Sequence, residues 1–187
     1  MLVLLLGCIE AGKTTFNNAL SKVLIERYGI CEPSPALNGL TILHNKTVIH
    51  SENETITFLD LPRHQDYIDY FEAKEEKVDA AILVLGVDVI KESELEEQVA
   101  YCKKAGIELA CIYVPKKEFF EEEFVEFSLE LVIPIVEPIL NKHMMQLADN
   151  QWNCPVICGD SVEAITDPWG AEGDNVIKVL NMVKAIK

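Results

Sequence analysis

The feature that most constrains this chain is a glycine-rich turn between an apolar segment and an amphipathic one near the amino terminus. Residues 2–6 are five consecutive apolar residues, which is the length and composition of a buried strand. The pattern Gly7-x-x-x-x-Gly12-Lys13-Thr14 follows at once. Apolar residues then recur at helical spacing up to Gly29, where a helix would stop: Phe16, Ala19, Leu20, Val23 and Leu24. The order of strand, loop and helix predicts a site for the phosphates of a nucleotide.

The residue types in this loop suit a phosphate ligand. Gly7 and Gly12 let the backbone turn closely around an anion, so that successive N–H groups and the positive end of the helix face it. Lys13 adds a positive charge, and the hydroxyl of Thr14 is a ligand that Mg²⁺ accepts. The other interpretation is a glycine-rich turn that binds no ligand. It does not explain why a strand pattern precedes the turn and a helix pattern follows it, as in a phosphate-binding loop. We expect the site to be lined by Gly7, Cys8, Ile9, Glu10, Ala11, Gly12, Lys13 and Thr14.

Composition narrows the classes of partner. The chain has 31 acidic and 16 basic residues. Its binding to nucleic acid or to an anionic membrane would release few counterions from that partner, so non-specific binding of this kind is disfavoured. No apolar run is long enough to span a membrane. The 187 residues are enough to bury a full core, and no linker is evident. We therefore expect residues 1–187 to form one domain.

The six cysteines include no Cys-x-x-Cys pair, and several fall on predicted strands or helix faces. We interpret them as reduced, buried thiols, which is typical of a cytoplasmic protein. Cys154 and Cys158 are close enough in sequence to suggest a metal site. The histidines and the second cysteine pair that such a site needs are absent nearby, so core packing is the preferred interpretation.

Strands and helices alternate along the rest of the chain. We expect strands at 47–50, 55–59, 80–85, 109–114 and 155–158, and helices at 67–77, around 95–102, at 119–149 with interruptions at Pro134 and Pro138, and at 175–186. Residues 30–38 are predicted to be an irregular loop because they contain Pro33 and Pro35. This alternation predicts an α/β fold with a mostly parallel sheet flanked by helices. In such a fold the ligand-binding loops lie at the carboxyl ends of the strands. Asp60 stands at the carboxyl end of the strand predicted at 55–59.

Three segments, taken together and in order, resemble the GTP-binding domain of translational GTPases, closest to elongation factor Tu and the selenocysteine-specific elongation factor. Residues 7–14 resemble the phosphate loop of that family, and Asn38-Gly39-Leu40-Thr41-Ile42 is similar to its Arg-Gly-Ile-Thr-Ile switch segment. Residues 60–67 are similar to Asp-x-Pro-Gly-His-x-Asp-Tyr. The resemblance implies a P-loop NTPase fold of the small-GTPase type, with Mg²⁺ and with GTP or GDP as the ligand.

The resemblance also implies roles for single residues. Thr41 would be the second hydroxyl on Mg²⁺, ordered only when a third phosphate is present, so that residues 30–41 would act as a switch. Thr15 would contact the inner phosphates, and Asp60 would hold Mg²⁺ through water.

Catalysis would fall to Lys13 and His64. By the resemblance, His64 would orient the attacking water behind a hydrophobic gate formed by Ile9 and Leu40. A surface histidine that follows a proline turn is the other interpretation of His64.

Arg63 departs from the family pattern, which has glycine before the histidine. The amide that would face the third phosphate is kept, but the conformational freedom of glycine is lost. One interpretation is an impaired switch. The other is that the guanidinium enters the site as an arginine finger does; we prefer the first, since nothing else in the sequence favours the second.

The base-recognition loop departs further, because Pro115-Lys116-Lys117-Glu118 stands where the family has Asn-Lys-x-Asp. The asparagine amide that touches the base and ties back to the phosphate loop is therefore absent. Lys116 can still lie along the base, and Glu118 can still accept hydrogen bonds from guanine. The last base contact resembles Ser-Ala-Leu and is expected near Asp160 and Ser161.

Two functions remain open. The first is a Mg²⁺-dependent GTP-binding protein with slow hydrolysis, for which the family implies the ribosome or the translation machinery as partner. The second is a pseudo-GTPase that binds nucleotide weakly or not at all and serves as an interaction module. A small-molecule phosphotransferase is disfavoured, because no arginine-rich lid is visible. The two β-barrel domains that follow in the family are expected to be absent, since the sequence ends at Lys187.

Overall fold

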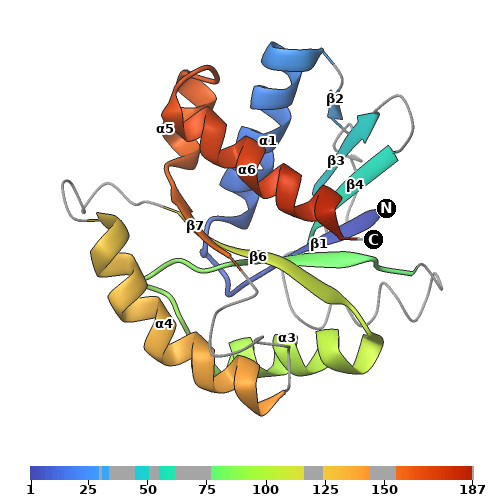
Figure 1. Ribbon diagram of the computed structural model, residues 1–187. Coiled ribbons are helices and arrows are strands. Elements are labelled where there is room, and N and C mark those ends of the chain that lie inside the picture. Colours follow the sequence, from blue (N-terminus) through green and yellow to red (C-terminus); the bar gives the residue numbers. More distant parts are fainter. Residues whose placement is uncertain are drawn as a thin grey trace.

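The computed structural model describes residues 1–29, 31–33, 45–50, 55–61, 77–115, 124–143 and 155–186. These residues form an α/β fold in which a twisted sheet separates two groups of helices (Figure 1). The predicted strands at 47–50, 55–59, 80–85, 109–114 and 155–158 are all present to within about two residues. The helix predicted at 67–77 and the switch segment at 38–42 lie outside the described residues.

The described part of the sheet has seven strands in the order β2-β3-β4-β1-β5-β6-β7. Their bounds are β1 Leu2–Leu6, β2 Cys31–Pro33, β3 Asn45–His50, β4 Thr55–Asp60, β5 Ala80–Val84, β6 Glu108–Pro115 and β7 Val156–Gly159. Strands β4, β1, β5, β6 and β7 run parallel, whereas β2 and β3 add an antiparallel edge. The mostly parallel sheet expected from the sequence is confirmed.

Helices cover both faces of the sheet, as Figure 1 shows. They are α1 Lys13–Tyr28, α3 Glu92–Ala105, α4 Phe124–Lys142, α5 Ser161–Thr166 and α6 Ala171–Ala185. Leu4 and Leu6 of β1 face a core shared with α3 and α4, while Val3 and Leu5 face one shared with α1, α5 and α6. All four side chains are at most 1% exposed, so the continuous apolar run of β1 is explained by burial on both faces.

Two local predictions were wrong. Helix α4 passes through Pro134 and Pro138 without interruption. Each proline removes a backbone hydrogen bond, but Val132, Val136 and Leu140 are buried at a four-residue spacing, and their packing on the core keeps the helix continuous. Residues 31–33, predicted to belong to an irregular loop, form strand β2, because they pair with β3. Gly29 does end α1 as predicted, with a φ of 64°.

Among the helices that the structure describes, none combines the length with the apolar composition that a membrane span requires.

Candidate functional site

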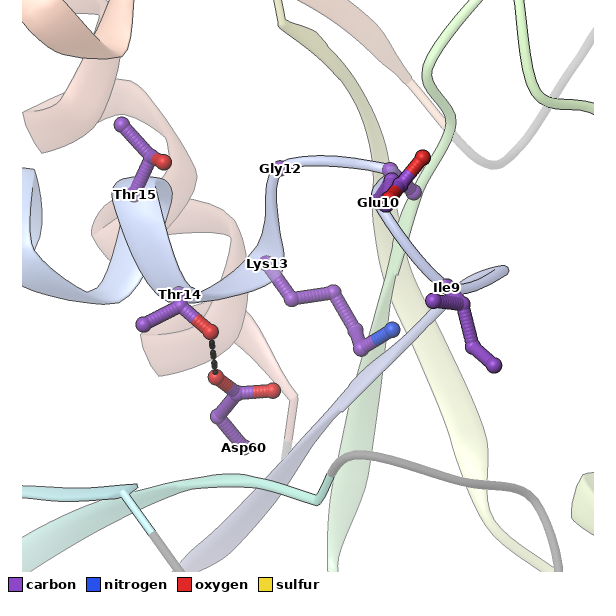
Figure 2. Close-up of a pocket in the computed structure, with 8 residues that line it drawn as sticks. Ile9, Glu10, Gly12, Lys13, Thr14, Thr15 and Asp60 are labelled. Carbon is purple, nitrogen blue, oxygen red and sulfur yellow. Dashed lines mark hydrogen bonds between the residues drawn. The ribbon is translucent and has the colours of Figure 1, made fainter.

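The predicted phosphate loop lies at the carboxyl edge of the sheet, between the end of β1 and the start of α1. It encloses a pocket of about 310 Å³ that opens beside the first turn of α1 (Figure 2). The pocket is lined by Ile9, Glu10, Ala11, Gly12, Lys13, Thr14, Thr15 and Asp60. The structure therefore brings predicted residues 9–14 together with Asp60, which lies 46 positions from Thr14 in the sequence, whereas Gly7 and Cys8 are not among the residues that line the pocket.

Two positions in the loop require glycine. Gly7 has a φ of 140°, and a Cβ atom there would lie 2.1 Å from the carbonyl oxygen of Val84 in β5. Gly12 has a φ of 92° and is the residue that caps the amino terminus of α1. Glu10 also has a positive φ, of 66°, which is uncommon for a residue with a side chain. The backbone thus wraps tightly, as a loop that surrounds phosphates must.

Lys13 lies inside the loop and is only 6% exposed. Its Nζ donates hydrogen bonds of 2.8 Å to the carbonyl oxygens of Gly7 and of Cys8. Burial lowers the pKa of the ammonium group, and the nearby acidic groups, Asp60 first among them, partly oppose this shift. A buried charge with only neutral carbonyls as direct partners is well suited to attract a polyanion.

Thr14 and Asp60 form the other side of the pocket. The Thr14 hydroxyl donates a hydrogen bond of 2.6 Å to Asp60 Oδ2, the dashed line in Figure 2. Asp60 reaches this place because β4 pairs in parallel with β1, which sets it opposite Leu5. Asp60 is 5% exposed. Burial raises its pKa, while the Thr14 hydrogen bond and the Lys13 charge act in the opposite direction.

These two side chains fit Mg²⁺. A hydroxyl and a carboxylate are the hard oxygen ligands that this ion prefers, and it commonly binds through one or two protein groups, with phosphates and waters completing the octahedron. Within the described residues no group of three or more His, Cys, Asp or Glu side chains is placed to hold a metal by itself. The donor set therefore suits an ion that arrives with a phosphate ligand.

The ends of β6 and β7 lie next to the phosphate loop. A Cβ atom on Gly12 would lie 3.1 Å from Cγ of Pro115, and Pro115 pairs with Gly159 across the two strands. Asp160 accepts hydrogen bonds of 2.9 Å from the amides of Val162 and Glu163. Its side chain is therefore the amino-terminal cap of α5, a helix that the sequence analysis missed.

Ser161 is 3% exposed, and its hydroxyl lies 2.9 Å from the hydroxyl of Tyr113. The Asp160 amide donates a 2.8 Å hydrogen bond to Glu172. Both predicted contact residues are thus used within the protein through their side chains. Any base contact at Ser161 has to come from its backbone.

The remaining predicted site residues lie outside the described part of the chain: Thr41, Arg63, His64, Lys116 and Glu118, together with Leu40 of the expected gate. Ile9, the other gate residue, is 56% exposed at the mouth of the pocket. Gln98 was not predicted, although it touches the loop. The available signal was a polar residue on the apolar stripe that Leu95, Val99 and Cys102 form on α3.

Comparison with protein families agrees with this geometry. A family model described as the elongation factor Tu GTP binding domain matches residues 1–186. The match extends over every loop considered above.

The buried carboxyl of Asp60 yields a prediction on stability. Burial raises the pKa of Asp60 in the folded chain above the ordinary 3.8, so folding favours the protonated carboxyl. The resulting contribution to the free energy of unfolding is complete below pH 3.8, and it is lost as the pH rises through the pKa of the folded chain. Asp60→Asn keeps an oxygen that accepts from Thr14 and removes the charge. We expect its melting temperature, measured without nucleotide and with a chelator, to exceed that of the wild type by a few degrees near about pH 7 and to converge near about pH 4.

Asp174→Asn is the matched control, because the Asp174 side chain is 63% exposed while it pairs with Arg27. It should not gain stability as the pH rises. An Asp60→Asn protein that melts below the wild type near neutral pH would contradict the burial argument.

Proposed function

Since the chain belongs to the family of elongation factor Tu GTP-binding domains, we propose that it binds GTP and GDP together with Mg²⁺ and hydrolyses GTP slowly. The observation that carries this proposal is the pocket whose lining combines a buried Lys13 with the hydrogen-bonded Thr14–Asp60 pair. Amide groups of the loop and of the first turn of α1 would bind the inner phosphates, with Thr15 beside them. Thr14 and Asp60 would hold Mg²⁺, which supplies charge neutralisation for the phosphates.

The chemistry proposed is positioning and charge stabilisation without a covalent intermediate. Lys13 would donate to the outer phosphates. Thr41 would add a second hydroxyl beside the metal when a third phosphate is present, and His64 would orient the attacking water; both roles rest on the family resemblance. Arg63 in place of glycine is the reason to propose slow turnover, because the amide that faces the third phosphate loses conformational freedom.

A pseudo-GTPase is the second candidate, and a specific observation favours it. Pro115 offers no amide donor, and its ring lies so near Gly12 of the phosphate loop that a Cβ atom on Gly12 would be 3.1 Å from it. The side chains of Asp160 and Ser161 are used within the protein. A site that keeps its phosphate contacts but loses base contacts binds nucleotide less selectively, because hydrogen bonds to the base edge supply most discrimination.

The cellular setting is part of the same proposal. We propose that residues 1–187 act as one G domain in the cytoplasm and that the partner belongs to the translation machinery, with the ribosome as the first candidate. The acidic balance of 31 to 16 charged residues argues that any contact with RNA is made through other proteins or through a local basic surface.

Nucleotide titration tests the proposal directly. We expect micromolar binding of GDP and GTP to the purified chain with Mg²⁺, weaker binding with a chelator, and exclusion of ATP, measured by calorimetry. Lys13→Ala should abolish binding, because it removes the cation that faces the phosphates. Its thermal unfolding curve serves as the folding control. A wild-type chain that binds no nucleotide, or that binds GDP and ATP equally weakly, would favour the pseudo-GTPase. Unchanged affinity in Lys13→Ala would refute the phosphate-loop assignment.

Arg63→Gly separates the two interpretations of the arginine. We expect the single-turnover rate of GTP hydrolysis to rise several-fold, because glycine restores the freedom of the backbone that faces the third phosphate. Phosphate release is the measurement. A fall of roughly 10³-fold or more would instead indicate that the guanidinium acts on the transition state as an arginine finger.

The base loop allows a repair experiment. Pro115→Asn combined with Glu118→Asp restores the amide and the shorter carboxylate of the family pattern, and we expect GDP to bind about 10-fold more tightly. Pro115→Ala is the control, since it removes the ring without adding an amide. If the repaired chain binds GDP no better than this control, the placement of the base loop is wrong.

A further inference from the structure

Trp169 is the most exposed of the large apolar side chains in the part of the chain that the structure describes. It is 67% exposed, in the loop of residues 167–170 that joins α5 to α6. Pro168 beside it is buried, so the loop packs on the protein while the indole extends into solvent. Tryptophan carries a large apolar area and is enriched among the residues that dominate binding at protein interfaces. Its position therefore indicates a contact surface.

The loop that carries Trp169 is held in place by Arg27, near the end of α1. The Arg27 guanidinium donates hydrogen bonds to two backbone carbonyl oxygens of the loop, and it forms an ion pair of 2.7 Å with Asp174 on α6. A Cβ atom on Gly173 would lie 2.1 Å from the carbonyl oxygen of Pro168, so α6 packs closely on the loop. The indole is thus presented on a fixed backbone, which lowers the ordering cost of binding a partner.

One face of the indole already has a cation beside it. Cζ of Arg27 lies 5.5 Å from the centroid of the Trp169 ring, within the range of a cation–π interaction. The charge of Arg27 is balanced by Asp174, with which it pairs. Because Arg27 lies over one face, the exposed area of Trp169 includes the opposite face, which presents the same π electrons. That face can accept a second cationic or apolar group.

The segment around Trp169 is acidic. Residues 161–177 contain no lysine or arginine, and their acidic residues are Glu163, Asp167, Glu172 and Asp174. Glu163 and Asp167 are exposed. A surface of this charge attracts a basic segment of another protein. It repels nucleic acid, and it repels a second copy of this chain, which has a net charge of −15.

This surface lies away from the candidate nucleotide site. Helices α1, α5 and α6 pack on the same face of the sheet (Figure 1), and the loop after α5 contacts the carboxyl end of α1 through Arg27. The phosphate loop precedes the amino end of α1. The 16 residues of this helix separate its two ends by about 24 Å. A partner at Trp169 therefore leaves the phosphate loop open to its ligand.

We propose that Trp169, together with the exposed carboxylates of Glu163 and Asp167, forms a docking surface for a basic segment of a partner protein. An arginine side chain of that segment would stack on the open face of the indole, and its other cations would face the carboxylates. The inference goes beyond the proposed function and does not depend on nucleotide binding, because none of these residues lines the pocket.

The probe is a capped hexapeptide, Arg-Leu-Arg-Arg-Leu-Arg, and the same peptide with citrulline in place of arginine is its uncharged control. Calorimetry on the full chain measures the affinity of each peptide. We expect the arginine peptide to bind, and to bind roughly 10-fold more weakly to Trp169→Ala, because an interface anchor is lost. The double variant Glu163→Gln with Asp167→Asn should also weaken binding and reduce its dependence on salt.

Leu131→Ala is the matched control variant. Leu131 is 40% exposed on α4, which packs on the other face of the sheet. Its replacement should leave the affinity for the arginine peptide within about twofold of the wild type. The melting temperature of Trp169→Ala and its affinity for GDP are measured on the same samples. Both should stay near the wild-type values, because the indole is mostly exposed and lies away from the pocket.

Three results would overturn the inference. The first is an arginine peptide that fails to bind, or that binds wild type and Trp169→Ala equally. The second is equal affinity for the citrulline peptide, which would remove the argument from charge. The third is another occupant of the surface, seen either as a dimer that Trp169→Ala dissociates in sedimentation or as single-stranded RNA whose binding Trp169→Ala abolishes. Failure of the chain to bind nucleotide would overturn the proposed function alone.

Discussion

The rest of the site depends on the hydrogen bonds that hold the buried ammonium group of Lys13. It is held by two backbone carbonyls of its own loop. That arrangement requires the loop to close tightly, which in turn requires Gly7 against β5 and a glycine cap on α1. Asp60, buried across the pocket, adds a second ionisable group whose charge is disfavoured by burial. Burial of these two charges is therefore expected to lower the stability of the fold when no ligand is present, which is common where a protein keeps preorganised charges for function.

The two sides of the candidate site differ in the chemical groups that they present. On the phosphate side, amides, Lys13, Thr14 and Asp60 form a set of groups suited to anion and metal. On the side of β6 and β7, the ring of Pro115 lies next to Gly12 and offers no hydrogen-bonding group. Asp160 and Ser161 are hydrogen-bonded within the protein. This contrast between the two sides is why one sequence supports two proposals: a slow GTPase, and a pseudo-GTPase that binds nucleotide weakly or not at all and acts as an interaction module.

Much of the site was predictable because its signals are local. The loop pattern, the strand before it and the helix after it lie within Leu2–Gly29, and glycine and apolar spacing specify them without reference to the rest of the chain. The elements that were missed depend on distant partners. Strand β2 forms because it pairs with β3, and α4 stays continuous through two prolines because its apolar face packs against the sheet. The local propensity of these residues predicts neither the pairing of β2 with β3 nor the packing of α4.

The sequence by itself determined the α/β fold, the phosphate loop and the candidate ligands Lys13, Thr14 and Asp60, because residue type and spacing along the chain are enough to predict them. Only the tertiary structure decided that Thr14 and Asp60 meet, that Pro115 rests on Gly12 and that Gln98 holds the Gly7 carbonyl. These contacts join residues far apart in the chain, and the register of parallel strands together with the packing of α3 brings them within reach. Such distances follow from the three-dimensional arrangement of the elements, which residue spacing alone does not specify.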